Sequence, residues 1–242
     1  MEKYEVPELW GRVFSVGVRD PEAGHSRCDE FRKRGTTYNA YLVLGKKKNA
    51  LIGCVPAAFS EELMGKVDQL ANLEDLAYVV IQSRKPEHSG ALPDILNTAT
   101  RATVMTPVGG KEELISRYHL PTNQLHAVKA GNRLDLGDRH LEFIELYGDE
   151  ELLLFSPDNG MFFSGEYFST HVAQGICDED IEDIIDIARL SFDKLLTNKQ
   201  RGVEEVSSVA QGFKIKVIAP AHGVVFKNPK RILEAYSKWL VQ

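Results

Sequence analysis

The sequence has few cysteines, no excess of basic residues and no long apolar run. Its 3 cysteines are an odd number without metal-ligand spacing, which argues against a disulfide framework. A net charge of -6 argues against a surface for nucleic acid or an anionic membrane. No stretch reaches the roughly 20 apolar residues of a transmembrane helix, and the N-terminal sequence MEKYEVPELW has no signal-peptide core. We therefore expect a cytoplasmic protein that binds neither nucleic acid nor membranes.

Strand-like and helix-like segments alternate in the first third of the chain. β-branched and aromatic residues predict strands at 12–18 and 37–44. Continuous apolar runs predict buried strands at 50–54 and 76–81. Ser60, followed by two glutamates, has the features of a helix N-cap. These signals together indicate an α/β protein.

The rest of the chain continues this alternation. We expect a polar loop at 82–89, a helix through Leu92 and Leu96, strands at 103–105 and 125–128, a β-rich stretch at 133–163, a helix at 181–195, a strand at 214–218 and a final helix at 232–239. The sequence has no internal repeat and no flexible linker. It therefore predicts a single domain over residues 1–242, with two β-rich layers between helices.

Three loops at predicted strand ends carry histidines, carboxylates or both, and chemistry often gathers at such places. The first runs from Gln82 to Pro93, the second from Phe163 to His171, and the third from Ile218 to Gly223. The loops are far apart in the sequence, so a fold that brings them together would form one site.

The motifs in and around these loops resemble those of flavodiiron proteins. The matching segments are Arg34–Leu42, His88–Pro93, Gly131–Gly137 and the loop at His222. The resemblance covers nearly the whole chain. It implies the metallo-β-lactamase-like αββα sandwich that forms the N-terminal, di-iron domain of that family.

The resemblance also implies which positions would bind metal. The first metal loop of the family reads His-x-Glu-x-Asp-His, and its four ligand positions fall on Ser83, Lys85, Glu87 and His88. A further histidine ligand has no counterpart in the stretch 146–151. The bridging aspartate falls on Glu166, the last histidine on His222, and a nearby aspartate of the family on Gly53.

The lost ligands all belong to the first iron of the family pattern. Glu87, His88, Glu166 and His222 remain as candidate ligands of one Fe, Zn or Mn ion. His171 is a candidate for a supporting position next to them. The ammonium of Lys85 could instead lie between Glu87 and Glu166 and replace a metal by its charge. The sequence leaves open a metal-free site, one metal and two metals.

The family resemblance suggests a function related to O2 or NO. We find no phosphate loop for FMN, so we expect no FMN on this chain alone. The loss of ligands favours a binding or sensory protein, with a flavoprotein or signalling partner, over an autonomous reductase. The alternatives are a reductase subunit that receives electrons from a separate flavoprotein, and a metal-free pseudoenzyme partner. A hydrolase is disfavoured because its His-x-His-x-Asp-His loop is absent. We expect a monomer or a weak homodimer.

Overall fold

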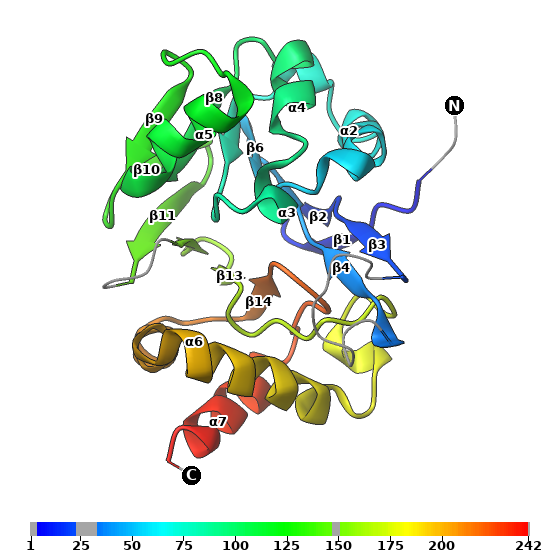
Figure 1. Cartoon of the computed structure of the whole chain (residues 1–242), viewed down its shortest axis with the longest axis vertical. Helices are drawn as coiled ribbons and strands as arrows, with labels where there is room; N and C mark the ends of the chain where they lie inside the picture. Colours follow the sequence, from blue (N-terminus) through cyan, green and yellow to red (C-terminus); the bar gives the residue numbers. More distant parts are fainter. Residues whose placement is uncertain (1–3, 23–32, 147–150, 242) are drawn as a thin grey trace.

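Two β-sheets stacked between layers of helices form the framework of the protein. The computed structural model describes residues 4–22, 33–146 and 151–241. In Figure 1, α2, α4 and α5 lie on one side of the strands and α6 and α7 on the other. This is the αββα order predicted from the sequence. Within the described residues, no helix is both long and apolar enough to cross a membrane.

The first sheet has seven strands, which follow the order β1-β2-β5-β6-β7-β8-β9. Their bounds are β1 (Glu8–Trp10), β2 (Val13–Ser15), β5 (Tyr41–Leu44), β6 (Asn49–Ile52), β7 (Tyr78–Val80), β8 (Thr103–Pro107) and β9 (Leu125–Val128). Strands β1 to β6 pair antiparallel, and β6 to β9 pair parallel. Parallel neighbours end at the same edge of a sheet, so the loops that follow β6 and β7 lie together.

The second sheet has five strands, β10 (Arg133–Asp135), β11 (His140–Glu145), β12 (Leu152–Ser156), β13 (Met161–Gly165) and β14 (Val217–Pro220). Its last pair, β13 and β14, is parallel. The residues that follow these two strands therefore emerge side by side. A separate antiparallel pair, β3 (Val18–Asp20) and β4 (Thr36–Tyr38), connects to the first sheet.

Helices cover the outer face of each sheet. On the first sheet these are α2 (Ser60–Asp68), α4 (Leu92–Thr98) and α5 (Lys111–Tyr118), and on the second α6 (Ile184–Gly212) and α7 (Pro229–Trp239). The shorter elements are α3 (Pro86–Ser89), η1 (Ala57–Phe59), η2 (Leu73–Asp75), η3 (Val108–Gly110) and η4 (Asp178–Asp180).

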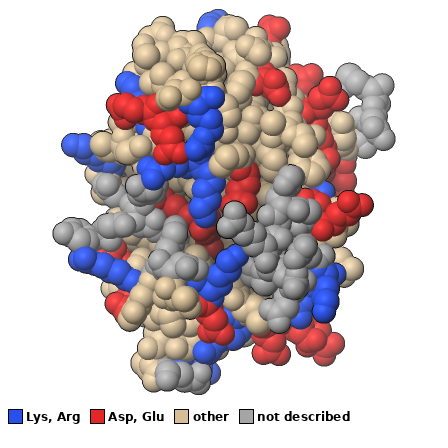
Figure 2. Space-filling model, in the orientation of Figure 1, with Lys and Arg blue, Asp and Glu red and all other residues tan. Residues whose placement is uncertain are grey.

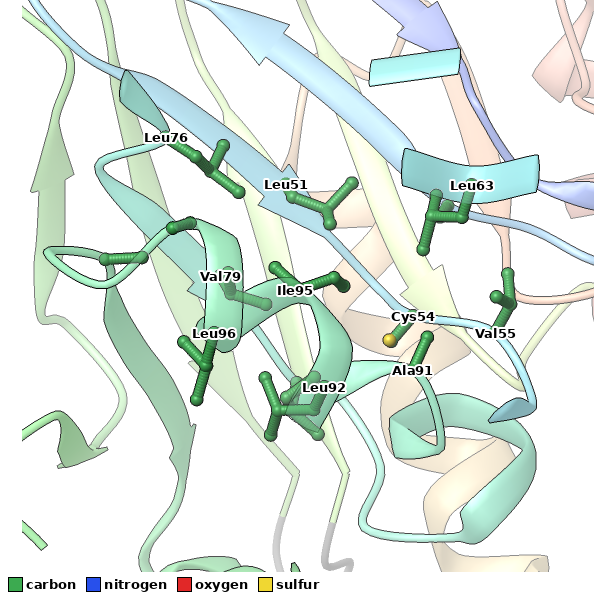
Figure 3. Packing of buried hydrophobic residues seen from close by; sticks show 14 of the residues in the cluster. Leu51, Cys54, Val55, Leu63, Leu76, Val79, Ala91, Leu92, Ile95 and Leu96 are labelled. Atoms are coloured by element: carbon green, nitrogen blue, oxygen red, sulfur yellow. The ribbon is translucent and has the colours of Figure 1, made fainter. Parts of the chain in front are cut away.

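Three hydrophobic cores fill the spaces between the four layers. One joins the first sheet to α2, α4 and α5, one lies between the sheets, and one joins the second sheet to α6 and α7. Figure 3 shows part of the first core, where Cys54 lies beside Ala91. Burial raises the pKa of the Cys54 thiol to about 12, so this residue acts as a small apolar side chain.

The predicted strands at 12–18 and 37–44 are wrong as single strands, because each is broken in two. The amides of Val16 and Gly17 both donate to the carbonyl of Ala40, at 2.9 and 3.1 Å, which forms a bulge. A side chain at position 17 would place its Cβ 2.4 Å from the Tyr38 carbonyl oxygen, so only glycine fits there. The chain thereby leaves the first sheet and forms the β3–β4 pair.

Several predicted boundaries also differ. Ser60 is not an N-cap, because η1 runs directly into α2 and Ser60 is the first helical residue. Part of the predicted loop at 82–89 is helix α3, and α5 was not predicted. The predicted helix at 181–195 is α6, which begins at Ile184 and continues to Gly212. The last strand begins at Val217 and extends beyond the predicted 214–218 to Pro220.

Candidate metal site

Glu87 and His88 reach the site on the short helix α3, after β7. The chain leaves β7 through Gln82, whose buried side-chain amide donates to backbone carbonyls of β12 and β13 at 2.8 and 3.2 Å. These two bonds tie the loop to the second sheet. Pro86 then occupies the first turn of α3, where its fixed φ favours a helix. The helix places Glu87 and His88 where the two sheets meet.

His222 comes from the second sheet, in the loop after β14. Its ring is buried, and Nδ1 lies 2.6 Å from the carbonyl oxygen of Thr37. A carbonyl can only accept, so Nδ1 carries the proton and Nε2 keeps the lone pair. Burial lowers the pKa of His222, while the Glu87 carboxylate acts in the opposite direction. The ring is therefore held neutral, in the form that binds metal ions.

Glu87, His88 and His222 form the one group of potential metal donors among the described residues, with donor atoms all within 4.8 Å of one another. Glu87 Oε1 lies 3.7 Å from His88 Nε2, and the two imidazole centroids are 4.9 Å apart. Two imidazoles and a carboxylate suit Fe(II), Mn(II) or Zn(II). Two bonds of at most about 2.2 Å span about 4.4 Å, so a closure of a few tenths of an ångström would fit one ion.

Lys85 forms an ion pair with Glu166, the carboxylate that comes from the second sheet. Glu166 follows β13, and its Oε1 lies 3.9 Å from His88 Nε2. Lys85 Nζ forms an ion pair and a hydrogen bond with that same oxygen. An ammonium has no lone pair and cannot bind a metal, but its charge neutralises a carboxylate as a metal would. Glu166 is therefore held by Lys85, next to the group of three.

Ser83 and His171 lie on two sides of this group. Ser83 is buried and, with Gly53, His88 and Glu166, lines a cavity of about 10 Å³, enough for one water molecule. His171 stacks on His222 with ring centroids 4.4 Å apart, and its Nδ1 lies 3.1 Å from the Thr36 hydroxyl. Burial, together with the neighbouring His222, lowers the pKa of His171 well below its ordinary value.

All the residues singled out from the sequence thus lie around one site. The alternative left open by the sequence placed Lys85 between Glu87 and Glu166; in the structure Lys85 pairs with Glu166, whereas Glu87 lies beside His88. Of the stretch in which the family histidine has no counterpart, residues 147–150 lie outside those that the structure describes. Whether these side chains bind a metal remains a prediction.

Glu151 and Tyr38 also lie at the site, although the sequence did not single them out. Glu151 is only 3% exposed, and its Oε2 accepts from the backbone amide of Glu166 at 3.2 Å. The available signal was a charged residue directly before the apolar strand β12. Tyr38 packs edge-on against His222, with centroids 5.7 Å apart. Burial, reinforced by Asp20, raises its pKa to about 12, so its hydroxyl stays protonated.

A profile described as ODP family beta lactamase matches residues 36–223. The chain belongs to this family. It is 33% identical over 221 residues to a nitric oxide reductase of Moorella thermoacetica, covering 85% of this chain and 54% of the relative. It is 30% identical over 242 residues to the anaerobic nitric oxide reductase flavorubredoxin of Klebsiella pneumoniae, covering 94% of this chain and 49% of the relative. The ODP-family chain thus spans about half the length of these relatives.

A solved structure agrees with the fold. The flavodiiron protein of Giardia intestinalis superposes with a TM-score of 0.87 at 21% identity, covering 99% of this chain and 60% of the other. At this identity the likeness establishes the fold alone. This likeness confirms the metallo-β-lactamase-like sandwich that the motifs predicted. The family match over residues 36–223, together with the nitric oxide reductase relatives, confirms the predicted family.

Proposed function

We propose that this domain binds a single divalent metal ion, with Fe(II) as the preferred candidate, and that it functions in binding or sensing NO or O2. Glu87, His88 and His222 are the proposed ligands. The observation that carries the proposal is the ion pair of Lys85 with Glu166, directly beside these three donors. The names of the curated relatives support a role related to NO.

The donor set supports one ion better than two. Ser83 and Lys85 offer a hydroxyl and an ammonium where the family pattern has ligands, and neither is a usual donor for iron. A second ion would also require Lys85 to leave Glu166, since a divalent cation and an ammonium would repel each other on one carboxylate. We therefore propose that the domain performs no multi-electron reduction by itself.

The protein's own groups would prepare such a site. A bound Fe(II) would supply a coordination position for a small diatomic ligand. The Thr37 carbonyl holds His222 in the tautomer with a free Nε2. Lys85 offsets the charge of Glu166, and the ring of Tyr38 packs edge-on against His222 while its protonated hydroxyl donates to Asp20.

The test is the metal content of protein purified and loaded anaerobically with Fe(II), measured by elemental analysis, with electron paramagnetic resonance after addition of NO. We expect about one iron per chain and the spectrum of an isolated iron. His222→Ala should abolish uptake, whereas His140→Ala, at the first residue of β11 and outside the donor group, should not. Two irons with the signature of a coupled pair would overturn the proposal and favour a reductase subunit fed by a separate flavoprotein. No uptake of Fe, Zn or Mn would also overturn it, in favour of a metal-free pseudoenzyme.

A further inference from the structure

The loop that presents His222 is held at several points by one residue that does not belong to the donor group, Asn39. This loop, residues 220–223, begins at the end of β14, and its backbone carbonyls point toward the protein interior. The side-chain amide of Asn39 donates to the carbonyls of Pro220 and Gly223, each at 2.9 Å. Its backbone amide donates to the carbonyl of Ala221 at 2.8 Å. A single residue therefore bonds to both ends and to the middle of the loop.

The same short segment also fixes the imidazole ring. Thr37, two residues before Asn39, accepts from His222 Nδ1 through its carbonyl, and its hydroxyl accepts from the Gly223 amide at 2.6 Å. The strand is interrupted at residues 39–40, between β4 and β5, and this interruption leaves polar groups of the segment available to bond to the loop. The backbone of the loop and the ring of His222 are thus both anchored to one short segment, residues 37–39, where the chain passes from the β3–β4 pair to the first sheet.

The position of Asn39 connects this anchor to the donor atoms. Asn39 is 9% exposed and lines the small cavity together with His88 and Glu166. The primary amide is suited to this place because its two N–H groups can serve two carbonyls. An aspartate at position 39 would place carboxylate oxygens, which only accept, against carbonyl oxygens that also only accept. An alanine would leave two buried carbonyls without their hydrogen-bond donors.

We propose that Asn39 is a positioning residue of the metal site. It fixes loop 220–223 so that His222 Nε2 meets the donor atoms of Glu87 and His88, and so sets metal affinity without touching the metal. This inference rests on the proposed function for its metal and on the structure for its geometry. Residues that orient a ligand in this way typically change metal affinity 10–100-fold when they are replaced.

The first experiment is a Co(II) titration of the full chain, followed by visible absorption. Asn39→Asp should weaken Co(II) binding at least about tenfold, the lower end of the range for such residues. The matched control is Tyr41→Phe, because the Tyr41 hydroxyl donates to the same Pro220 carbonyl at 2.6 Å but to one end of the loop only. This control should stay within about threefold of the wild type, well below the effect of a ligand-orienting residue. Equal affinities for Asn39→Asp and the wild type would overturn the proposal.

A second measurement does not need the metal. Nitrogen NMR of the metal-free protein reports the tautomer of His222, which should carry its proton on Nδ1 in the wild type and become mixed in Asn39→Asp. If the wild type fails to bind Co(II), the proposed function fails, and this spectrum alone decides the role of Asn39. An unchanged tautomer in the variant would then overturn the inference. If Asn39→Asp does not fold, Asn39→Ser, which keeps one donor, is measured in the same way and should show a smaller change of the same kind.

Discussion

The charge of Lys85 is the residue-scale feature on which the metal-free state of the site depends. Lys85→Glu removes the partner of Glu166 and places a third carboxylate beside Glu87. We expect the metal-free variant to lose about 1–2 kcal/mol of stability, a modest value because the ammonium is about half exposed and partly screened. Added Zn(II) or Fe(II) should restore stability, since a ligand of the native state stabilises it by mass action.

Thermal melting of both proteins, with and without metal, checks this prediction. Lys85→Met is the control, because it removes the charge but adds no carboxylate. It should be destabilised less and should respond less to metal than Lys85→Glu. Identical melting of Lys85→Glu and wild type in all conditions would show that Lys85 does not replace a metal ion.

At the residue scale, the sequence could predict groups that belong to recognisable motifs. Glu87, His88 and His222 lie in loops with family-like neighbours, so their order along the chain was enough to bring them together. Glu151 lies outside these motifs, and Asn39 lies inside the matching segment Arg34–Leu42 but is not a metal-ligand position of the family pattern, so neither was singled out. Their importance comes from hydrogen bonds to distant backbone groups, Glu166 and Pro220 among them, and no spacing in the sequence records such contacts.

Among the elements, the short helix α3 depends on a glycine that lets it approach η1. A Cβ on Gly90 would lie 2.5 Å from the Ala57 amide nitrogen and 2.8 Å from the Pro86 carbonyl oxygen, both backbone atoms. Gly90→Ala should therefore shift α3, cost about 1–3 kcal/mol as overpacking does, and weaken metal binding through Glu87 and His88.

Urea denaturation and Co(II) titration test this prediction together. Gly212→Ala is the control, because nothing lies within 4 Å of its Cβ and position 212 is the last residue of α6. Alanine there should be neutral or stabilise by up to about 1 kcal/mol. Equal stabilities of the two variants would show that the close contact at Gly90 relaxes without cost.

Elements with a clear apolar pattern were predictable, and those without one were not. Strand β7 has the continuous apolar run of a buried strand, and helix α7 buries Ile232, Ala235 and Tyr236 at helical spacing. Helix α5 fully buries only Leu114, with Ile115 and Tyr118 packed beside it, so its apolar face is too short to stand out among the charged residues of the segment. The break between β4 and β5 was not predicted for the opposite reason. Both strands are largely buried, so their sequence looks like one continuous strand.

For the whole molecule, the surface suggests weak self-association. The large hydrophobic side chains exposed within the described parts of the chain are Trp10, Val108 and Val241, which belong to three different segments. Figure 2 shows acidic and basic side chains interspersed on one face. Stable interfaces need a contiguous, well-packed area, so we expect a monomer or a weak dimer in sedimentation velocity at micromolar concentration. A dimer that persists at nanomolar concentration would contradict this.

The separation of the proposed ligands along the chain has a consequence for how the protein is made. Glu87 and His88 lie in the first sheet's loops, whereas His222 follows β14, after every other strand of the second sheet. During synthesis the N-terminal half emerges from the ribosome first. This half carries two of the three proposed ligands, Glu87 and His88, and the third, His222, lies far along the sequence. A metal ion could therefore not organise this half in the way that zinc organises a zinc finger. Metal acquisition would have to wait until β14 has paired with β13, so it would be among the last steps in the maturation of the protein.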